Sequence, residues 1–142
     1  MRQAADTDLP AILALYQQVD GEPSIDIERA LVLFDRMTLY PCYRIYLAML
    51  GKQIRGTFSI LIMDNLAHAA RPVGIVENVV VDQRWRGQGI GREMMAFARQ
   101  YCRKAGCYKM MLSSDQSRIH AHRFYQALGF ARHGYSFAVE FD

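Results

Sequence analysis

A nearly unbroken apolar run that leads into a glycine-rich loop limits most strongly what this chain can fold into. Residues 73–81 read Val-Gly-Ile-Val-Glu-Asn-Val-Val-Val, a pattern typical of a strand that is covered on both faces. The loop Arg86–Gly91 follows, and beyond it apolar residues recur at helical spacing until about Gly106. A buried strand that passes through a short loop into an amphipathic helix indicates an α/β sheet with helices on its faces.

The remainder of the chain adds further helices and strands around this unit. Cap residues and helical spacing predict helices over residues 6–19 with a stop at Gly21, over 26–39, and over 118–128 with Gly129 at the C-terminal end. Aromatic and β-branched runs predict strands over 1–4, 43–50, 54–63 and 108–112, and one or two more over 130–141. This order predicts an α/β (α+β) fold, a sheet of mixed direction flanked by about four helices.

Length and composition set broad limits on the class of protein. The 142 residues suit a single domain spanning 1–142, and a chain that is 51% apolar and 22% charged is typical of a folded globular protein. No apolar run approaches the roughly 20 residues that cross a bilayer, and the N-terminus lacks the apolar segment of a secretory signal. We therefore expect a cytoplasmic protein that does not bind membranes.

Charge and cysteine content argue against some partners. The net charge is +3, but the basic residues are scattered, so nucleic-acid binding is not favoured. Cys42, Cys102 and Cys107 lack the spacing of metal ligands. His120 and His122 stand two apart, which points them to different sides of a helix. We expect three reduced thiols and no metal site.

The loop Arg86–Gly91 has the composition of an anion cradle. Alternate glycines from Gly87 to Gly91 let the backbone turn sharply and approach a ligand closely. The helix that follows presents unpaired N–H groups at its N-terminus, where the helix dipole favours an anion. Arg86 and Arg92 add positive charge on either side. Such a loop favours a phosphate or pyrophosphate as its ligand.

Two common phosphate-binding motifs do not fit this loop. A P-loop requires Gly-Lys followed by Ser or Thr, whereas Arg92 and Glu93 follow the last glycine here. A dinucleotide fingerprint requires a third glycine where Met94 stands and an acidic residue near Lys109, where there is none. What remains is the pattern Arg-x-x-Gly-x-Gly, preceded by a strand that ends Val-Val-Asp.

This segment resembles the coenzyme A motif of the GNAT superfamily of N-acetyltransferases. The matching string from Val79 to Gly91 reads Val-Val-Val-Asp-Gln-Arg-Trp-Arg-Gly-Gln-Gly-Ile-Gly. A second match, from Ala121 to Phe130, resembles the family's Ala-x-x-Phe/Leu-Tyr-x-x-x-Gly-Phe segment. The order of predicted elements over the whole chain also agrees. The resemblance implies a GNAT-type fold with a mixed, mostly antiparallel sheet.

The resemblance also implies acetyl-coenzyme A (acetyl-CoA) as the co-substrate and assigns residues to it. Backbone groups of Val79, Val80 and Val81 would pair with the pantetheine arm, and the amide at Val79 would polarise the thioester carbonyl. The pyrophosphate would be held by the loop residues Arg86, Gly87, Gln88, Gly89, Ile90, Gly91 and Arg92. Arg118 stands where the family often has asparagine, so it either reaches a phosphate or is a solvated residue at a helix start.

Tyr125 is the candidate acid, because it matches the family's tyrosine and a departing thiolate benefits from a proton donor. The alternative interpretation is packing alone. Ala121, Phe124, Tyr125 and Leu128 are spaced as an apolar stripe on one face of the predicted helix. A catalytic role predicts that Tyr125→Phe preserves cofactor binding and slows turnover, whereas a packing role predicts unchanged turnover.

Glu77 is the candidate base. It interrupts an apolar strand, where an unpaired carboxylate is costly, and strand alternation places it on the same face as Ile75 and Val79. Some family members that act on small phosphorylated or phosphonylated amines carry an acidic residue in a similar context. Two alternatives remain: Glu77 pairs with an arginine as structural support, or it binds the substrate ammonium without taking its proton.

Together these features predict an enzyme that acetylates the primary amine of a small molecule, such as an amino sugar or an aminophosphonate. A protein lysine or N-terminus is a second class of acceptor. An acyl-CoA-binding sensor without catalysis is the rival to an enzyme. Glu77 and Tyr125 together favour the enzyme, since a pure sensor needs neither. Dimerisation is common in the family, so a homodimer is also considered.

Overall fold

The computed structural model describes residues 1–19, 23–139 and 141. The chain forms two compact units, Met1–Met111 and Leu112–Asp142. The first unit contains the sheet and most of the helices, and the second contains one helix and the C-terminal tail. The helix stop predicted at Gly21 lies outside the described residues.

Five strands of the first unit form one sheet, in the order β1-β2-β3-β4-β5. Their bounds are β1 Arg2–Gln3, β2 Tyr43–Leu50, β3 Gln53–Met63, β4 Val73–Val81 and β5 Lys109–Met111. Neighbouring strands are antiparallel except β4 and β5, which run parallel. The predicted sheet of mixed, mostly antiparallel direction is confirmed, and so are its first five predicted strands.

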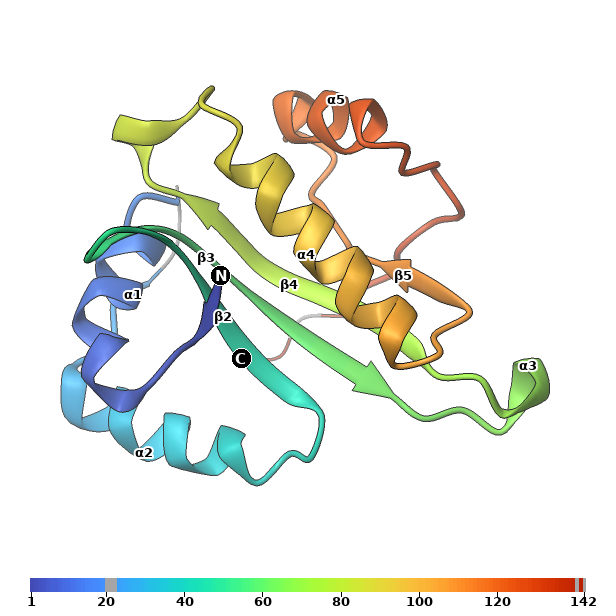
Figure 1. Ribbon diagram of the computed structural model, residues 1–142, viewed down its shortest axis with the longest axis horizontal. Helices are drawn as coiled ribbons and strands as arrows, with labels where there is room; N and C mark the ends of the chain where they lie inside the picture. The colour runs from blue at the N-terminus through green and yellow to red at the C-terminus, as the bar shows by residue number, and fades with distance from the viewer. Residues whose placement is uncertain (20–22, 140, 142) are drawn as a thin grey trace. The chain divides into compact units, whose positions relative to one another are not determined.

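Helices cover both faces of this sheet (Figure 1). One face carries α4, Ile90–Lys104, and the other carries α1, Leu9–Tyr16, and α2, Ile27–Thr38. The Asp26 carboxylate caps α2 by accepting a hydrogen bond from the Arg29 N–H at 2.7 Å. The shorter elements are the 3₁₀ helices η1, Asp6–Asp8, and η2, Gln83–Trp85, and the turn α3, Ala67–Ala70.

Alternation along β2 divides the core between the two faces. The ring of Tyr46 lies on the side of α4, where its centroid is 4.8 Å from that of Phe97 and 5.7 Å from that of Phe58. The next residue, Leu47, points to the opposite face and is fully buried in the cluster that contains Ile12 of α1. Both layers also contact β4, so the strand that carries Glu77, Val79, Val80 and Val81 is held from both sides.

The second unit begins with a loop that leads into α5, Ile119–Ala127. The helix predicted over 118–128 is confirmed. Gly129 follows it with φ +83°, the left-handed conformation that commonly ends a helix.

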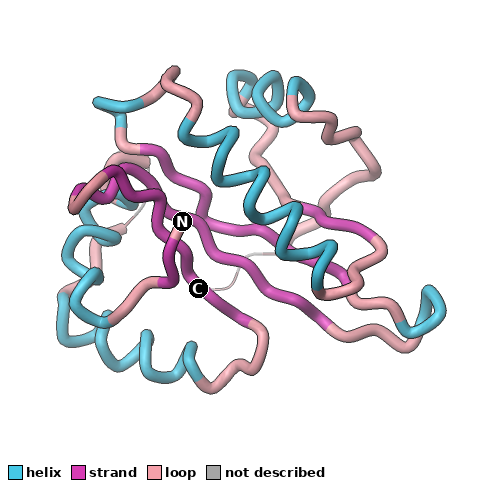
Figure 2. Tube along the Cα trace, viewed as in Figure 1, coloured by secondary structure: helices cyan, strands magenta, loops and turns pink. Residues whose placement is uncertain are grey.

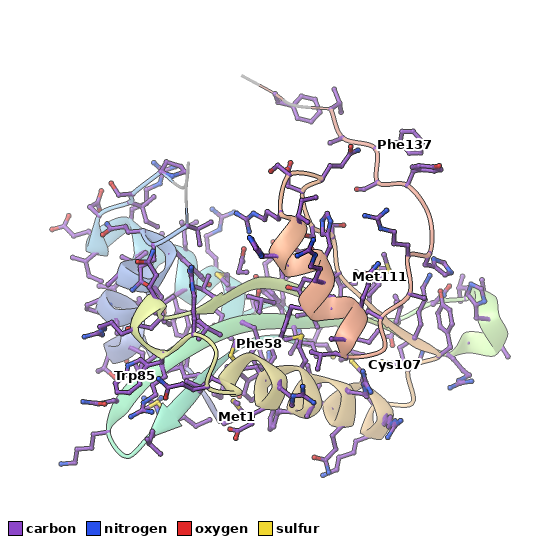
Figure 3. All side chains as sticks on the ribbon, turned by 90° about the horizontal axis from the view of Figure 1, so that it is seen from above. Met1, Phe58, Trp85, Cys107, Met111 and Phe137 are labelled. Carbon is purple, nitrogen blue, oxygen red and sulfur yellow. The ribbon has the colours of Figure 1, made fainter. Side chains whose placement is uncertain are left out.

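The strands predicted over 130–141 are wrong. Residues 130–139 and 141 form no strand in the structure, and Figure 2 draws the tail as loop. Alternating Tyr135, Phe137 and Val139 produced the strand-like pattern. Extended chain without a pairing partner gains no ladder hydrogen bonds and is not stable as a strand. The side chains are accordingly exposed, that of Phe137 by 92% (Figure 3).

Candidate active site

The two edges of β4 have different partners along its length. On one edge, β3 pairs with β4 from Val73 to Val81. On the other edge, β5 pairs only with residues 73–75. Within the described part of the chain, no strand pairs with residues 76–81 on that edge. We call residues 76–81 the open half of β4. Backbone groups on this edge can pair with an added extended segment, as the resemblance implies for the pantetheine arm.

A β-bulge interrupts the open half. The register pairs on either side of it are Ser59 with Glu77 and Thr57 with Val80. Two residues of β4, Asn78 and Val79, therefore stand opposite one residue of β3. Asn78 has φ +54°, in the left-handed region, which asparagine adopts more readily than most residues with a side chain. The bulge lies where the resemblance implies a polarising backbone amide.

The bulge corrects the predicted orientation of Glu77. Simple alternation places Glu77 and Val79 on one face, but an extra residue shifts the alternation by one step. The register instead places Val80 on the face that Glu77 shares with its partner Ser59. The period of the sequence could not show this shift, because a bulge is a property of two paired strands.

The Glu77 side chain is exposed rather than buried in the apolar strand. The ion pairs among the described residues are Arg2–Asp8 and Arg84–Asp82. The interpretation of Glu77 as the partner of a structural arginine therefore has no support within the described residues. The exposed carboxylate of Glu77, which belongs to the open half, can meet an amine from solution.

Asp82 organises the turn that follows β4. Its side chain is buried, and its carboxylate forms an ion pair with Arg84 at 2.6 Å. Hydrogen bonds from the Arg84 side chain, outweighing the opposing effect of burial, lower the pKa of the Asp82 carboxyl. The Asp82 N–H donates to the Arg55 carbonyl oxygen at 2.9 Å, and the Arg55 guanidinium lies 3.7 Å from the centroid of the Trp85 ring. These contacts determine where the loop starts.

Two of the three glycines in the predicted anion cradle adopt the conformation of a sharp turn, whereas Ile90 and Gly91 already belong to α4. Gly87 and Gly89 have φ values of +77° and +86°, which residues with a Cβ rarely adopt. Gly89 is the N-cap of α4 and supplies no capping side chain; the Glu93 N–H donates to its carbonyl oxygen at 3.1 Å. The N–H groups of residues 90–92 therefore have no partner within the helix and can meet an anion.

The positive charge at this loop comes from Arg86 and Arg92. Both side chains are exposed, and the Arg86 Nε–H donates to the Val81 carbonyl oxygen at 3.2 Å, at the end of β4. Arg84 contributes less, because Asp82 balances its charge. The loop and the open half of β4 thus fit an anionic ligand that continues as an extended chain.

Tyr125 lies on α5, in the second unit. Its ring makes edge-to-face contacts with Phe124 and Phe130, at centroid distances of 5.1 and 5.6 Å. The Phe130 N–H donates to the Tyr125 carbonyl oxygen at 3.1 Å and closes the end of the helix. The residue is half-buried, which suits packing and leaves part of it accessible. Its catalytic role stays a prediction.

The start of α5 is organised by Asp115. Its carboxylate accepts from the Ser117 N–H at 2.8 Å, and the hydrogen bonds from Ser117, its hydroxyl first, lower the pKa of the Asp115 carboxyl. The Nε2 atom of His122 lies 2.8 Å from the Asp115 carbonyl oxygen, so we assign the ring proton to Nε2. Arg118 is the N-cap and is exposed, in keeping with a solvated residue at a helix start.

Two residues beside the candidate site, Ser59 and Asn78, were not predicted from the sequence to have a role. Ser59 is a fully buried polar residue of β3, and Asn78 is the left-handed residue of the bulge. Each stands out in the sequence as a polar residue among apolar ones: Ser59 lies inside the apolar run 58–62, and Asn78 lies inside a valine-rich strand. Neither signal identifies a bulge without knowledge of which residues pair.

Comparison with known proteins identifies the family. The chain matches the Acetyltransferase (GNAT) family over residues 9–130. It belongs to that family, and the enzyme class is acetyltransferase. The family uses acetyl-CoA as co-substrate, in agreement with the resemblance in the loop and in the segment from Ala121 to Phe130.

Individual relatives are similar over nearly the whole chain. Glucosamine 6-phosphate N-acetyltransferase of Trypanosoma brucei brucei is 28% identical over 134 residues, which are 94% of this chain and 89% of that protein. Aminoalkylphosphonate N-acetyltransferase of Salmonella typhimurium strain LT2 is 28% identical over 137 residues, 96% of this chain and 88% of that protein. The solved structure of glucosamine-6-phosphate N-acetyltransferase from Arabidopsis thaliana superposes with a TM-score of 0.85 at 25% identity, covering 99% and 97% of the two chains. The predicted GNAT-type fold is confirmed.

The described residues contain neither a metal cluster nor a membrane-spanning helix. No three His, Cys, Asp or Glu side chains in residues 1–19, 23–139 and 141 gather as metal ligands. Over the same ranges, no helix has both the length and the apolar character to span a bilayer. The three cysteines are free thiols, and Cys102 is buried.

Proposed function

We propose that the chain transfers an acetyl group from acetyl-CoA to the primary amine of a small molecule. The observation that carries this proposal is that the open half of β4 leads directly to the uncapped glycine N-terminus of α4. An extended arm can pair with the first while its phosphates meet the N–H groups of the second. Membership of the GNAT family supports the same co-substrate.

The proposal gives each candidate residue one task. Backbone groups of residues 79–81 align the pantetheine arm, and residues 86–92 hold the pyrophosphate. The Val79 N–H stabilises negative charge on the carbonyl oxygen that is attacked. Glu77 removes the amine proton, directly or through a water, and Tyr125 donates a proton to the departing sulfur. When bound, acetyl-CoA supplies an activated acetyl thioester.

The acceptor that we propose is a small amine that also carries a phosphate or phosphonate. The two curated relatives reported above are named for glucosamine 6-phosphate and for aminoalkylphosphonates. The exposed Glu77 carboxylate suits the ammonium end of such a molecule, and the net charge of +3 is compatible with its anionic end. We further propose that residues 1–142 act as one catalytic domain, since the family match includes parts of both units.

Thiol release from acetyl-CoA over a panel of amines tests this proposal. The panel contains glucosamine 6-phosphate, 2-aminoethylphosphonate, their counterparts without the anionic group, and a lysine peptide. We expect turnover with the first two and a lower kcat/KM for the uncharged counterparts, with the added acetyl group located on nitrogen by mass spectrometry. Turnover confined to the lysine peptide would reject the acceptor class. Tight binding of acetyl-CoA without turnover on any amine would identify a sensor instead.

The role of Tyr125 is tested by Tyr125→Phe, which removes one oxygen atom and keeps the ring. We expect kcat to fall by about 100-fold or more, because a positioned acid contributes about 10²- to 10⁴-fold, with acetyl-CoA binding preserved. Tyr135→Phe, on the exposed tail of the same unit, is the matched control and should leave kcat unchanged. Equal kcat values for the two variants and the wild type would leave Tyr125 with a packing role only.

A further inference from the structure

Ser59 and Asn78 join the β4 bulge into one chain of hydrogen bonds. The Asn78 side-chain amide donates to Ser59 Oγ at 3.4 Å, and the Ser59 hydroxyl donates to the Glu77 carbonyl oxygen at 3.2 Å. These two hydrogen bonds therefore connect the Asn78 side chain, through Ser59 of β3, to the backbone of Glu77. These hydrogen bonds hold Glu77 and Asn78, the two residues before Val79, and the proposed reaction uses the Glu77 side chain and the Val79 N–H.

The burial of Ser59 makes this arrangement specific. Its side chain is fully buried, so its hydroxyl depends on protein partners, and a lost partner would be destabilising. Donors and acceptors aligned in one chain also polarise and strengthen one another. Asn78 meanwhile holds a left-handed conformation that persists only where the surroundings support it. Ser59 provides that support from the neighbouring strand.

We propose that Ser59, acting with Asn78, is a positioning residue for acetyl transfer. Its hydroxyl holds the Glu77 carbonyl, and its oxygen holds the Asn78 amide. Both contacts keep the backbone of residues 77–79 in the bulged conformation, from which the proposed reaction uses the Val79 N–H. This inference rests on the proposed function, and one of the tests below does not require turnover.

The chain offers a matched control two residues away on β3. Thr57 is buried as completely as Ser59, and its hydroxyl donates to a backbone carbonyl at the same distance of 3.2 Å. Its acceptor, however, is Tyr46 on β2, on the edge of β3 away from the bulge. Ser59→Ala and Thr57→Val each delete one buried hydroxyl, but only Ser59→Ala releases the bulge.

Steady-state kinetics and thermal melting of the two variants separate positioning from general stability. We expect Ser59→Ala to lower kcat by about 10- to 100-fold, the loss typical of a misplaced reacting group, with little change in KM for acetyl-CoA. We expect Thr57→Val to lower the melting temperature similarly and to keep kcat within about twofold. Equal kcat losses in both variants, or an unchanged kcat in Ser59→Ala, would overturn the proposal.

A second variant, Asn78→Gly, tests the proposal even if Ser59→Ala fails to fold. Asn78 is exposed, and Asn78→Gly keeps the left-handed backbone while it removes the amide donor. We expect a smaller fall in kcat, about threefold to tenfold, because the Ser59 hydroxyl still holds the Glu77 carbonyl. The double variant Ser59→Ala/Asn78→Gly should lose little beyond Ser59→Ala alone. Fully additive losses would mean that the two side chains act separately, which would overturn the proposed chain.

Infrared spectroscopy of bound acetyl-CoA, labelled with ¹³C at the acetyl carbonyl, tests positioning without turnover. We expect the carbonyl stretch to move to lower frequency on binding to the wild type and to Thr57→Val, and to move less on binding to Ser59→Ala at equal saturation. If the wild type binds acetyl-CoA and acetylates no amine, the proposed function fails and this comparison still decides the role of Ser59. An identical shift in all three proteins would contradict that role.

Discussion

The first half of β4, residues 73–75, has a strand on either side, whereas the open half, residues 76–81, pairs with β3 alone. In the first half, α4 lies so close that a Cβ on Gly74 would stand 2.2 Å from the Cys102 Sγ atom. In the open half, Glu77 and Asn78 are exposed and a bulge interrupts the ladder. One strand therefore changes, within three residues, from a strand paired on both edges to one with an open edge.

The difference shows how a sheet can have an unpaired edge without aggregating through that edge with another chain. Long, flat and apolar edges are prone to aggregation, and bulges and charged side chains on the edge counteract this. The open half of β4 has both devices, the bulge at Asn78 and the carboxylate of Glu77. The features that protect the edge are also those to which we assign roles in catalysis.

The largest expected effect in the open half is that of Glu77→Gln. A positioned base contributes about 10²- to 10⁴-fold, so we expect a kcat loss in that range together with a changed pH–rate profile. The fold should be unaffected, because the side chain is exposed. Glu28→Gln, on the first turn of α2, is the control and should leave the profile unchanged. A Glu77→Gln enzyme with the wild-type pH profile would rule out the base role.

In the loop that follows the open half, Gly89→Ala should weaken acetyl-CoA binding by about 10- to 100-fold. A left-handed residue with a Cβ is strained by about 1–3 kcal/mol, and the N–H groups at the start of α4 would shift to relieve that strain. Calorimetry gives the Kd. Gly51→Ala is the matched control, because Gly51 also has a positive φ and open space around its Cβ position but lies in the β2–β3 turn. Equal losses of affinity in both variants would show that the effect is not specific to the cradle.

In the first half of β4, Gly74→Ala should affect stability rather than chemistry. We expect the free energy of unfolding in urea to fall by about 1–3 kcal/mol, the usual cost of overpacking a core, while kcat of the folded enzyme stays within about twofold. Cys102→Ala removes the Sγ atom that the new methyl group meets, so the double variant should recover part of the loss. No recovery would indicate that the helix and the strand move apart instead.

The smallest effect concerns Asp82, where the open half ends. Hydrogen bonds from Arg84 lower the pKa of this carboxyl, so its charged form stabilises the fold. That stabilisation is present above the ordinary pKa of aspartate and is lost as the pH falls through the lowered value in the folded state. Asp82→Asn should therefore melt below the wild type at neutral pH and approach it in acid. Melting curves that stay equally far apart at every pH would contradict this assignment.

Asp8 provides the comparison for that experiment. The Arg2 side chain lowers the pKa of the Asp8 carboxyl in the same way, but this ion pair joins β1 to η1. Asp8→Asn should show the same dependence of melting temperature on pH and leave acetyl-CoA binding unchanged, whereas Asp82→Asn should also weaken that binding slightly.

The parts of the fold and site that could be predicted share one property, namely that their signal is local. The bounds of β4 followed from a run of apolar residues, and α4 followed from helical spacing after Gly89. The left-handed glycines of the cradle followed from the loop composition. The tail over 130–141 shows the limit, because its alternation is also local but a strand needs a partner that alternation does not specify.

By itself, the sequence determined the order of the main elements as far as α5, the glycine-rich segment at the start of α4 and the family to which the chain belongs, because each depends on residues that are neighbours along the chain. The tertiary structure decided which edge of β4 stays open, where the bulge lies, and that Ser59 of β3 holds it. These features depend on the pairing of segments nearly twenty residues apart, and pairing is set by the competition of whole strands for partners. Because of the same pairing, Glu77 lies on the face of β4 that Val80 occupies, not on the face of Val79 as alternation predicts.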